Sequence, residues 1–198
     1  MSPPPRRVGT LEIEQRGPLR GEAKLRAALD GFAIRVEGRV ALDVGAAAGG
    51  FVRVLLERGA RRVYAVDAGH GQLLGSLRQD PRVVNMEATN VATLDDISVP
   101  GRIDVVTVDV SYLSLSSAVS QLDRVDMAAG ADLVGLIKPM FELRLATAPA
   151  DDGSIASATS RATDGIVASG WAVLGTMPSP VTGSRGAREV LIHARWPG

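Results

Sequence analysis

The chain has 198 residues, of which 45% are hydrophobic and 4% aromatic, and it contains no cysteine. This length and apolar content suit one α/β domain with an aliphatic core, and a chain without cysteine forms neither disulfides nor thiolate metal sites. Its 22 Lys and Arg residues balance its 22 Asp and Glu residues, which excludes a strongly basic protein that holds nucleic acid by charge alone.

The beginning of the chain lacks the pattern of a targeting segment. Residues 1–19 include consecutive prolines and an Arg pair, so we expect a flexible tail ahead of one domain over residues 20–198. No apolar run reaches the length of a membrane span, and no apolar signal core follows the first residues. We therefore expect no membrane partner and a cytoplasmic protein.

The middle of the chain alternates helical and strand patterns. An amphipathic helix is predicted first, over residues 21–32, because Leu25, Leu29 and Phe32 recur at helical spacing. Buried strands are then predicted over residues 39–45, 62–69, 82–89, 102–110 and 131–138, with helices over residues 50–60, 71–79 and 115–125. Strands that are apolar on both faces and alternate with helices are typical of a parallel sheet covered on both sides.

The end of the chain breaks this alternation. Two strand patterns, residues 170–181 and 187–196, are separated only by a short turn rich in Gly and Ser. Strands so close in sequence must pair antiparallel, because a parallel crossover needs a dozen or more residues. The predicted fold class is therefore α/β, a Rossmann-like doubly wound and mostly parallel sheet that ends in an antiparallel hairpin. Residues 146–154 are the best candidate for a mobile loop.

A loop of small residues, "LDVGAAAGGF", lies between the first predicted strand and the helix after it. Open α/β sheets bind ligands at this position, where small side chains let backbone N–H groups approach a ligand. The loop matches neither G-x-G-x-x-G nor the phosphate loop G-x-x-x-x-G-K-[ST], so a triphosphate is not expected. The candidate cofactor residues in the loop are Gly45, Ala46, Gly49, Gly50 and Phe51.

Acidic residues stand at the ends of three consecutive predicted strands. Asp43, just before the loop, could accept a hydrogen bond from a ligand ammonium group. Asp67 is placed to bind two ribose hydroxyls, and Glu87 could reach the adenine side. Together these residues predict a site for S-adenosylmethionine, a nucleoside that carries an amino acid without pyrophosphate. The alternative is an ordinary strand–helix turn whose acids cap helices.

Several motifs can be recognised in order along the chain: "ALDVGAAAGGFVRVLLERGARRVYAVDAGHGQL", "DPRVVNMEATNV", "VDVSYLSL" and "IKPMFE", flanked by "GEAKL" and "SPVTGSRGAREVLIHAR". Over about residues 20–195 they resemble the FtsJ-like methyltransferase family, most closely its TlyA (haemolysin A) branch. The resemblance implies a class I methyltransferase fold and S-adenosylmethionine as cofactor. It also implies methylation of a ribose 2′-hydroxyl in RNA, which is ribosomal RNA in the TlyA branch.

The family's Lys-Asp-Lys-Glu tetrad falls on Lys24, Asp109, Lys138 and Glu189 of this sequence. The resemblance implies that Lys138 is the base and that Asp109 fixes its amine beside the sulfonium methyl group, which makes Asp109 a cofactor contact as well. Lys24 would be a second cation that favours the neutral form of Lys138 and stabilises charge developing on oxygen. Glu189 would orient one of the lysines.

The lysine count of the chain fits this assignment. Lys24 and Lys138 are its only lysines, and every other cationic side chain among the 22 is arginine. Arginine stays charged in proteins, whereas a lysine that is desolvated or close to another cation can lose its proton. A neutral amine beside a hydroxyl can then accept the proton as the methyl group arrives.

The sequence departs from the family in places that concern the acceptor. "GAAAGG" replaces the more usual Ser-Thr-Gly-Gly, Met140 stands where the branch has Gln, and Asp151 and Asp152 occupy a loop that is usually basic. TlyA-branch members carry a small RNA-binding module ahead of the catalytic domain, where this sequence has about twenty residues. RNA and a small-molecule acceptor (O- or N-methylation) therefore both stay open, with a non-catalytic cofactor-binding protein as a third interpretation. No metal is expected, and the oligomeric state is open.

Overall fold

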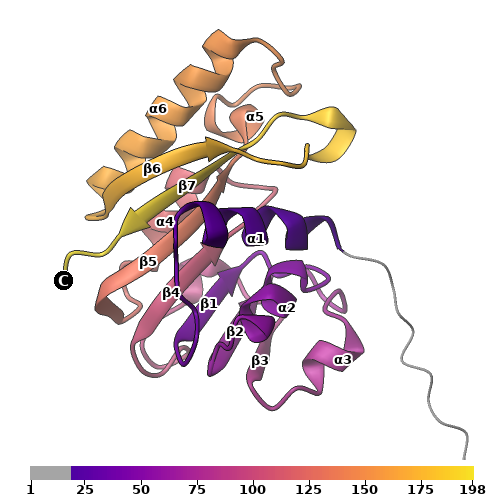
Figure 1. The fold of residues 1–198 in the computed structure, drawn as a ribbon, viewed down its shortest axis with the longest axis vertical. Coiled ribbons are helices and arrows are strands. Elements are labelled where there is room, and N and C mark those ends of the chain that lie inside the picture. Colours follow the sequence, from indigo (N-terminus) through magenta and orange to yellow (C-terminus); the bar gives the residue numbers. More distant parts are fainter. Residues whose placement is uncertain (1–18) are drawn as a thin grey trace, which may run out of the picture.

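A computed structural model describes residues 19–198, and the predicted tail lies outside them except for Leu19 (Figure 1). The strands are β1 (Val40–Val44), β2 (Arg62–Val66), β3 (Val83–Met86), β4 (Ile103–Val108), β5 (Met127–Ile137), β6 (Ala172–Pro178) and β7 (Val190–Arg195). The helices are α1 (Arg20–Gly31), α2 (Gly50–Glu57), α3 (Gly75–Arg78), α4 (Leu115–Val119), α5 (Pro139–Glu142) and α6 (Asp152–Ala168), with short 3₁₀ turns at Val91–Thr93, Ser120–Leu122 and Ser184–Gly186. None of the helices in this range is long and apolar enough to cross a lipid bilayer.

The strands form a mixed seven-stranded sheet in the order β3-β2-β1-β4-β5-β7-β6. Strands β1 to β5 run parallel to one another, whereas β7 is antiparallel to both β5 and β6. The predicted fold class and its antiparallel finish are therefore confirmed. The last strand lies inside the sheet, between β5 and β6, and because it runs antiparallel to β5 its first residue, Val190, pairs with Ile137 at the carboxyl end of β5.

Helices cover both faces of the sheet (Figure 1). On one face α1 and α2 bury apolar side chains such as Leu25, Leu29 and Leu55. On the other face α4 and α6 pack against the sheet through residues such as Leu115 and Ile166. Every residue of β1 is buried, as expected for a strand covered on both sides.

Helix α6 was not predicted, and the proposed loop over residues 146–154 was too long because α6 begins at Asp152. Asp151 caps the helix, since its side chain accepts a hydrogen bond of 2.8 Å from the backbone N–H of Ser154. The helix is rich in Ser, Thr and Gly, which are weak helix formers. Packing stabilises it instead, through four buried residues at helical spacing: Ile155, Ala158, Ala162 and Ile166.

Asp132 of β5 is a buried carboxylate surrounded by a histidine and two partly exposed arginines. It accepts hydrogen bonds from Arg39 (2.7 Å), from Arg195 (2.9 Å) and, in one tautomer, from His193 (2.8 Å). Burial by itself would raise the pKa of Asp132, but the bonds from His193, Arg39 and Arg195 outweigh it and hold that pKa well below its usual range. The cluster ties β5 to β7 and to the segment before β1.

Asp132→Ala should destabilise the fold by about 3 kcal/mol at pH 7, because it removes a buried carboxylate that accepts three hydrogen bonds and leaves the buried His193 without its partner. A carboxylate with a lowered folded-state pKa stabilises the protein above its unfolded pKa, so the difference from wild type should shrink as the pH falls below about 4. Urea unfolding at pH 7 and pH 3 measures both effects. The exposed pair of Arg58 and Asp30 is the control, and Asp30→Ala should cost less than about 1 kcal/mol. Equal losses for the two variants would contradict the prediction.

Candidate active site

Lys138 and Asp109 meet at the carboxyl edge of the sheet. Asp109 directly follows β4 and Lys138 directly follows β5, and these two strands are parallel neighbours. Parallel neighbours end at the same edge, so residues that follow them lie close together. Lys138 Nζ lies 2.5 Å from Asp109 Oδ1 and donates a 2.8 Å hydrogen bond to Ser111 Oγ.

Glu189 and Lys24 lie next to this pair and come from two other elements, the segment before β7 and helix α1. The antiparallel pairing sets Ile137 of β5 opposite Val190 of β7, so the residue before β7, Glu189, lies beside the end of β5. Lys24 projects from α1, with Nζ 2.6 Å from Glu189 Oε2 and 4.0 Å from Asp109 Oδ2. The structure thus brings the four predicted tetrad residues together, with one oxygen of Asp109 toward each lysine.

The tetrad is only partly accessible to solvent. The side chains of Lys24 and Glu189 are 8% and 5% exposed, whereas those of Lys138 and Asp109 are 14% and 20% exposed. Lys24 and Glu189 are therefore buried, whereas Lys138 and Asp109 are partly accessible to solvent. Partial burial strengthens the attraction between these charges, because less water screens them.

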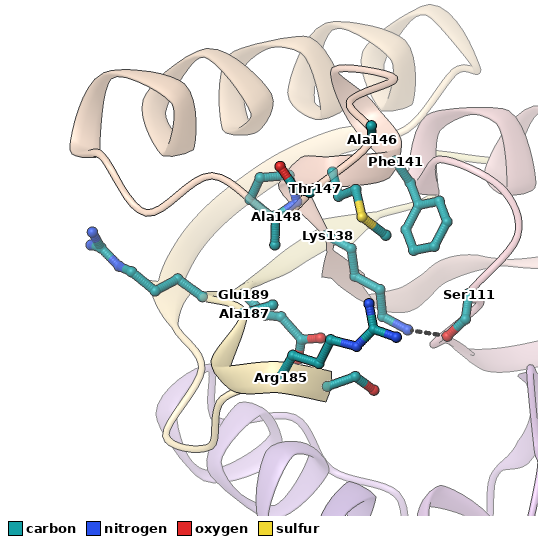
Figure 2. Close-up of a pocket in the computed structure, with 13 residues that line it drawn as sticks. Ser111, Lys138, Phe141, Ala146, Thr147, Ala148, Arg185, Ala187 and Glu189 are labelled. Atoms are coloured by element: carbon teal, nitrogen blue, oxygen red, sulfur yellow. Dashed lines mark hydrogen bonds between the residues drawn. The ribbon is translucent and has the colours of Figure 1, made fainter.

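Lys138 opens onto a pocket of about 490 Å³, which we call the Lys138 pocket (Figure 2). Its wall comes from the segment after β5 and from the segment between β6 and β7, including Phe141, Thr147, Arg185 and Arg188. Figure 2 shows Lys138 and Arg185 extending into the same space from opposite walls. A pocket of this size can hold a small molecule or one nucleotide unit of a longer chain.

A second pocket of about 350 Å³, the glycine-loop pocket, is lined by Leu19, Arg20, Gly21, Gly45, Ala46, Ala47, Ala48, Gly50, Phe51 and Asp109. Asp109 belongs to its wall and also pairs with Lys138 of the neighbouring pocket. The two pockets therefore meet at the Asp109–Lys138 pair. Gly45, Ala46, Gly50 and Phe51, predicted to contact a cofactor, all line the glycine-loop pocket, and Gly49 is not among its lining residues.

The glycines of the loop serve different purposes. Gly45 has φ +92°, and a Cβ atom there would lie 2.3 Å from the carbonyl oxygen of Asp109, so only glycine allows the loop to approach the segment after β4. A Cβ on Gly49 would meet the Leu77 side chain at 2.2 Å, and one on Gly50 would lie 3.3 Å from the Glu22 nitrogen. Gly49 thus permits packing against α3, and Gly50 permits close approach of α1 and α2.

Asp67, predicted to bind ribose hydroxyls, follows β2 and contacts the glycine loop. Its Oδ2 accepts a 2.8 Å hydrogen bond from the backbone N–H of Ala47, and its Oδ1 accepts one of 2.6 Å from Gly69. Carboxylate oxygens each carry two lone pairs, so both oxygens can accept a further bond. The ribose contact stays a prediction, and the structure adds that Asp67 orders the loop.

Asp43 is buried beneath the glycine loop rather than lining a pocket. Its Oδ1 accepts a 2.6 Å hydrogen bond from Thr107 on β4, while Oδ2 has no partner within residues 19–198. Burial raises the pKa of Asp43 to about 7 against the opposing hydrogen bond from Thr107, and the charges of Asp109 and Asp67 add to the rise. A buried carboxyl oxygen without a partner, with the carboxylates of Asp67 and Asp109 nearby, suits a cationic ligand, and S-adenosylmethionine is cationic.

Asp43 should make the stability of the protein depend on pH. Its pKa is raised from 3.8 to about 7 in the folded state, so the folded protein binds the extra proton and loses stability as the pH rises through this window. Asp43→Asn should not lose this stability. The difference in free energy of unfolding between variant and wild type should therefore shift in favour of the variant by about 2–3 kcal/mol from pH 5 to pH 8. Urea unfolding at the two pH values measures it. The exposed Asp123→Asn is the control, and a matching gain there, or none for Asp43→Asn, would contradict the prediction.

Glu87, predicted to reach adenine, directly follows β3 and holds the segment before α3. Its carboxylate accepts hydrogen bonds from the backbone N–H groups of Leu73 (3.0 Å) and Gln72 (2.5 Å) and lies 3.1 Å from Arg78 Nη2. The Leu73 bond, with those from Asn85 and Gln72 and the Arg78 charge, lowers the pKa of Glu87 to about 2. The helix predicted over residues 71–79 is confined to α3, Gly75–Arg78. The adenine contact stays a prediction.

Two residues of this region were not found from the sequence. Ser111 bonds to Lys138, and its only sequence signal was its place two residues after Asp109. Glu142 is almost fully buried and accepts from the backbone N–H of Leu115 (2.5 Å) and from the hydroxyl of Ser116 (3.0 Å). It ties α5, next to Lys138, to the start of α4. A glutamate within the apolar "IKPMFE" could have indicated a buried partner.

No group of His, Asp or Glu residues suited to a metal ion occurs in the part of the chain that the structure describes.

Comparisons with known proteins identify relatives of this chain. The curated 16S/23S rRNA (cytidine-2′-O)-methyltransferase TlyA of Mycobacterium tuberculosis is 41% identical over 183 residues, which cover 89% of this chain and 67% of that protein. The chain thus spans about two thirds of the length of this relative. A solved structure from Streptococcus thermophilus matches with a TM-score of 0.85 and 34% identity, over 89% of this chain and 66% of that one.

More distant structures share the fold. N-methyltransferase NodS from Bradyrhizobium japonicum, solved with S-adenosyl-L-homocysteine, has a TM-score of 0.62 at 18% identity, over 90% of this chain and 86% of that one. The expected class I methyltransferase fold and the TlyA-like resemblance are confirmed. The model of the FtsJ-like methyltransferase family matches residues 19–196, nearly the whole range that the structure describes. The chain therefore belongs to the FtsJ-like methyltransferase family.

Proposed function

We propose that the chain catalyses methylation of a ribose 2′-hydroxyl in ribosomal RNA with S-adenosylmethionine as the methyl donor. One observation carries the proposal: Lys138 and Asp109 stand 2.5 Å apart at the junction of the Lys138 pocket and the glycine-loop pocket. An acceptor hydroxyl in the first pocket and a donor in the second would meet at this pair. The name of the Mycobacterium tuberculosis relative supports the choice of acceptor.

The residues around the glycine-loop pocket suit S-adenosylmethionine. The cofactor carries a positively charged sulfur whose methyl group is the one transferred, and it also carries an ammonium group. Asp109 lines the pocket, Asp67 orders its loop, and Asp43 lies beneath it with an oxygen free. These carboxylates would favour a cationic ligand, and Gly45 would let it approach the backbone without a side chain in the way.

Lys138 would act as the general base. In its neutral form the amine accepts the hydroxyl proton while the oxygen gains the methyl group, so no free alkoxide has to form. Asp109 orients the amine, and Lys24 supplies positive charge 4.0 Å from the other oxygen of Asp109. Glu189 holds Lys24 in place. The rest of the rate would come from alignment of the hydroxyl with the methyl group.

Charge around the Lys138 pocket supports an RNA acceptor. Arg185 and Arg188 both belong to its wall. Arg188 is paired with Asp152 over 2.7 Å, whereas Arg185 makes no ion pair with another described residue. Arginine binds phosphate well because its planar guanidinium group presents several donors. The second candidate, methylation of a small molecule, rests on the volume of the pocket, about 490 Å³, which would enclose a small acceptor by itself.

An activity screen with labelled S-adenosylmethionine tests both candidates side by side. Ribosomal subunits, purified 16S and 23S rRNA, and a set of small hydroxyl and amine acceptors receive the same enzyme. Labelled RNA at low salt, with transfer that falls steeply between about 50 and 200 mM salt, is the expected result. Transfer to small acceptors that salt does not change would favour the second candidate, and failure to bind millimolar S-adenosylmethionine would rule out both.

A further inference from the structure

Ser111 contacts the same amine as Asp109. Figure 2 shows the hydrogen bond that Lys138 Nζ donates to Ser111 Oγ, which is 2.8 Å long. The same nitrogen lies 2.5 Å from Asp109 Oδ1. Ser111 and Asp109 both belong to the short segment between β4 and α4, so one piece of backbone positions both groups. Ser111 also lines the Lys138 pocket.

The number of bonds on the lysine nitrogen decides how it can act as a base. Besides its bond to Cε, the nitrogen has three positions, and in the neutral amine two hold hydrogen atoms and one holds the lone pair. Asp109 can accept one hydrogen, but the second hydrogen and the lone pair could then exchange places by rotation about the Cε–Nζ bond. A second acceptor removes this freedom.

We propose that Ser111 is a positioning residue for Lys138, an inference that rests on the proposed role of Lys138 as the base. Ser111 accepts the second N–H group, so the lone pair occupies the third position, which is open to the Lys138 pocket and to the acceptor hydroxyl. Lys138 itself is 14% exposed, which leaves room for that contact. Ser111 therefore acts on the rate of proton transfer and not on cofactor binding.

Single-turnover kinetics of Ser111→Ala tests the proposal on the acceptor that the wild-type enzyme methylates. At saturating cofactor and acceptor the rate should fall about five- to tenfold, the worth of one hydrogen bond, while the KM for acceptor and the Kd for S-adenosylmethionine stay unchanged. Ser111→Thr keeps an acceptor hydroxyl and should recover most of the rate. A wild-type rate in Ser111→Ala, or no recovery in Ser111→Thr, would overturn the proposal.

Ser114→Ala is the matched control in the same segment. Ser114 Oγ accepts from the backbone N–H of Ser117 and caps α4, without contact to Lys138. Its loss should lower the melting temperature and leave the single-turnover rate unchanged. If Ser114→Ala slows methyl transfer as much as Ser111→Ala, the effect of Ser111 is structural and the proposal is wrong.

A spectroscopic measurement separates this inference from the choice of substrate. Because the chain has two lysines, ¹³C-lysine labelling gives ε-methylene signals from Lys24 and Lys138 alone, and Lys24→Arg assigns them. An amine held by two partners keeps the two ε protons of Lys138 in different environments. Ser111→Ala should bring their shifts together and leave those of Lys24 unchanged. Unaltered Lys138 signals would refute the role of Ser111 whatever the acceptor is, since this measurement needs none.

Discussion

Lys138→Arg should abolish methyl transfer while cofactor binding and the melting temperature stay close to wild type. The substitution keeps a cation beside Asp109, where the ion pair is 2.5 Å long, so the local charge does not change. Arginine does not lose its proton in proteins and therefore cannot accept one from a hydroxyl. Loss of general base catalysis predicts a rate about 10²- to 10⁴-fold lower in single-turnover assays, with affinity for S-adenosylmethionine measured by calorimetry.

Lys24→Arg is the comparison that isolates proton transfer from charge. Lys24 is paired with Glu189 and would act only as a cation, so an arginine there should keep a larger part of the activity. A wild-type rate in Lys138→Arg would show that the amine is not the base. Equal losses at both positions would show that the ammonium shape, and not proton acceptance, is what the site requires.

Gly45→Ala should weaken cofactor binding and lower the rate about 100-fold. A Cβ atom at this position would lie 2.3 Å from the carbonyl oxygen of Asp109, so either the glycine loop or the tetrad aspartate has to move. A displacement of about 1 Å at a reacting group is enough for an effect of this size. The left-handed backbone, with φ +92°, adds about 1–2 kcal/mol of strain for a residue with a side chain.

Gly38→Ala is the control for the strain alone. Gly38 also has a left-handed backbone, with φ +72°, but a Cβ atom there would have no neighbour within 4 Å among the residues described. It should cost stability without changing cofactor affinity or rate. Calorimetry with S-adenosylmethionine, urea unfolding and single-turnover assays on both variants separate the effects. If the two variants lose the same stability and no activity, the close approach of Gly45 to Asp109 does not matter for catalysis.

Local patterns predicted most of the sheet but not the helices that depend on packing. Strands β1, β2 and β4 were predicted to within a few residues because apolar β-branched runs stand out against their surroundings. Helix α6 was missed because its Ser- and Thr-rich sequence has little helical preference of its own and is stabilised by contact with the sheet and α4. Likewise, the helix predicted over residues 71–79 is limited to α3, and Glu87 binds the backbone N–H of Leu73, fourteen residues earlier, in the segment before it.

The acids and glycines at strand ends were found from the sequence, but their partners were not. Asp67 was predicted to face a ligand, and the structure also bonds it to the N–H of Ala47 in the glycine loop. Asp43 lies beneath the loop and not on its surface, because β1 is buried on both faces. Residue type and position relative to a strand can be read locally, whereas a hydrogen-bond partner depends on which strand lies next to it.

The sequence by itself determined the class of fold, through its alternation of apolar strands and helices, and supplied the chemistry, through two lysines among many arginines. Only the tertiary structure decided that β7 lies between β5 and β6, which puts Glu189 beside the end of β5 and against Lys24, 165 residues away. It also decided that Ser111 contacts Lys138. The physical reason is that strand order arises from long-range pairing and burial, which no local pattern of side chains encodes.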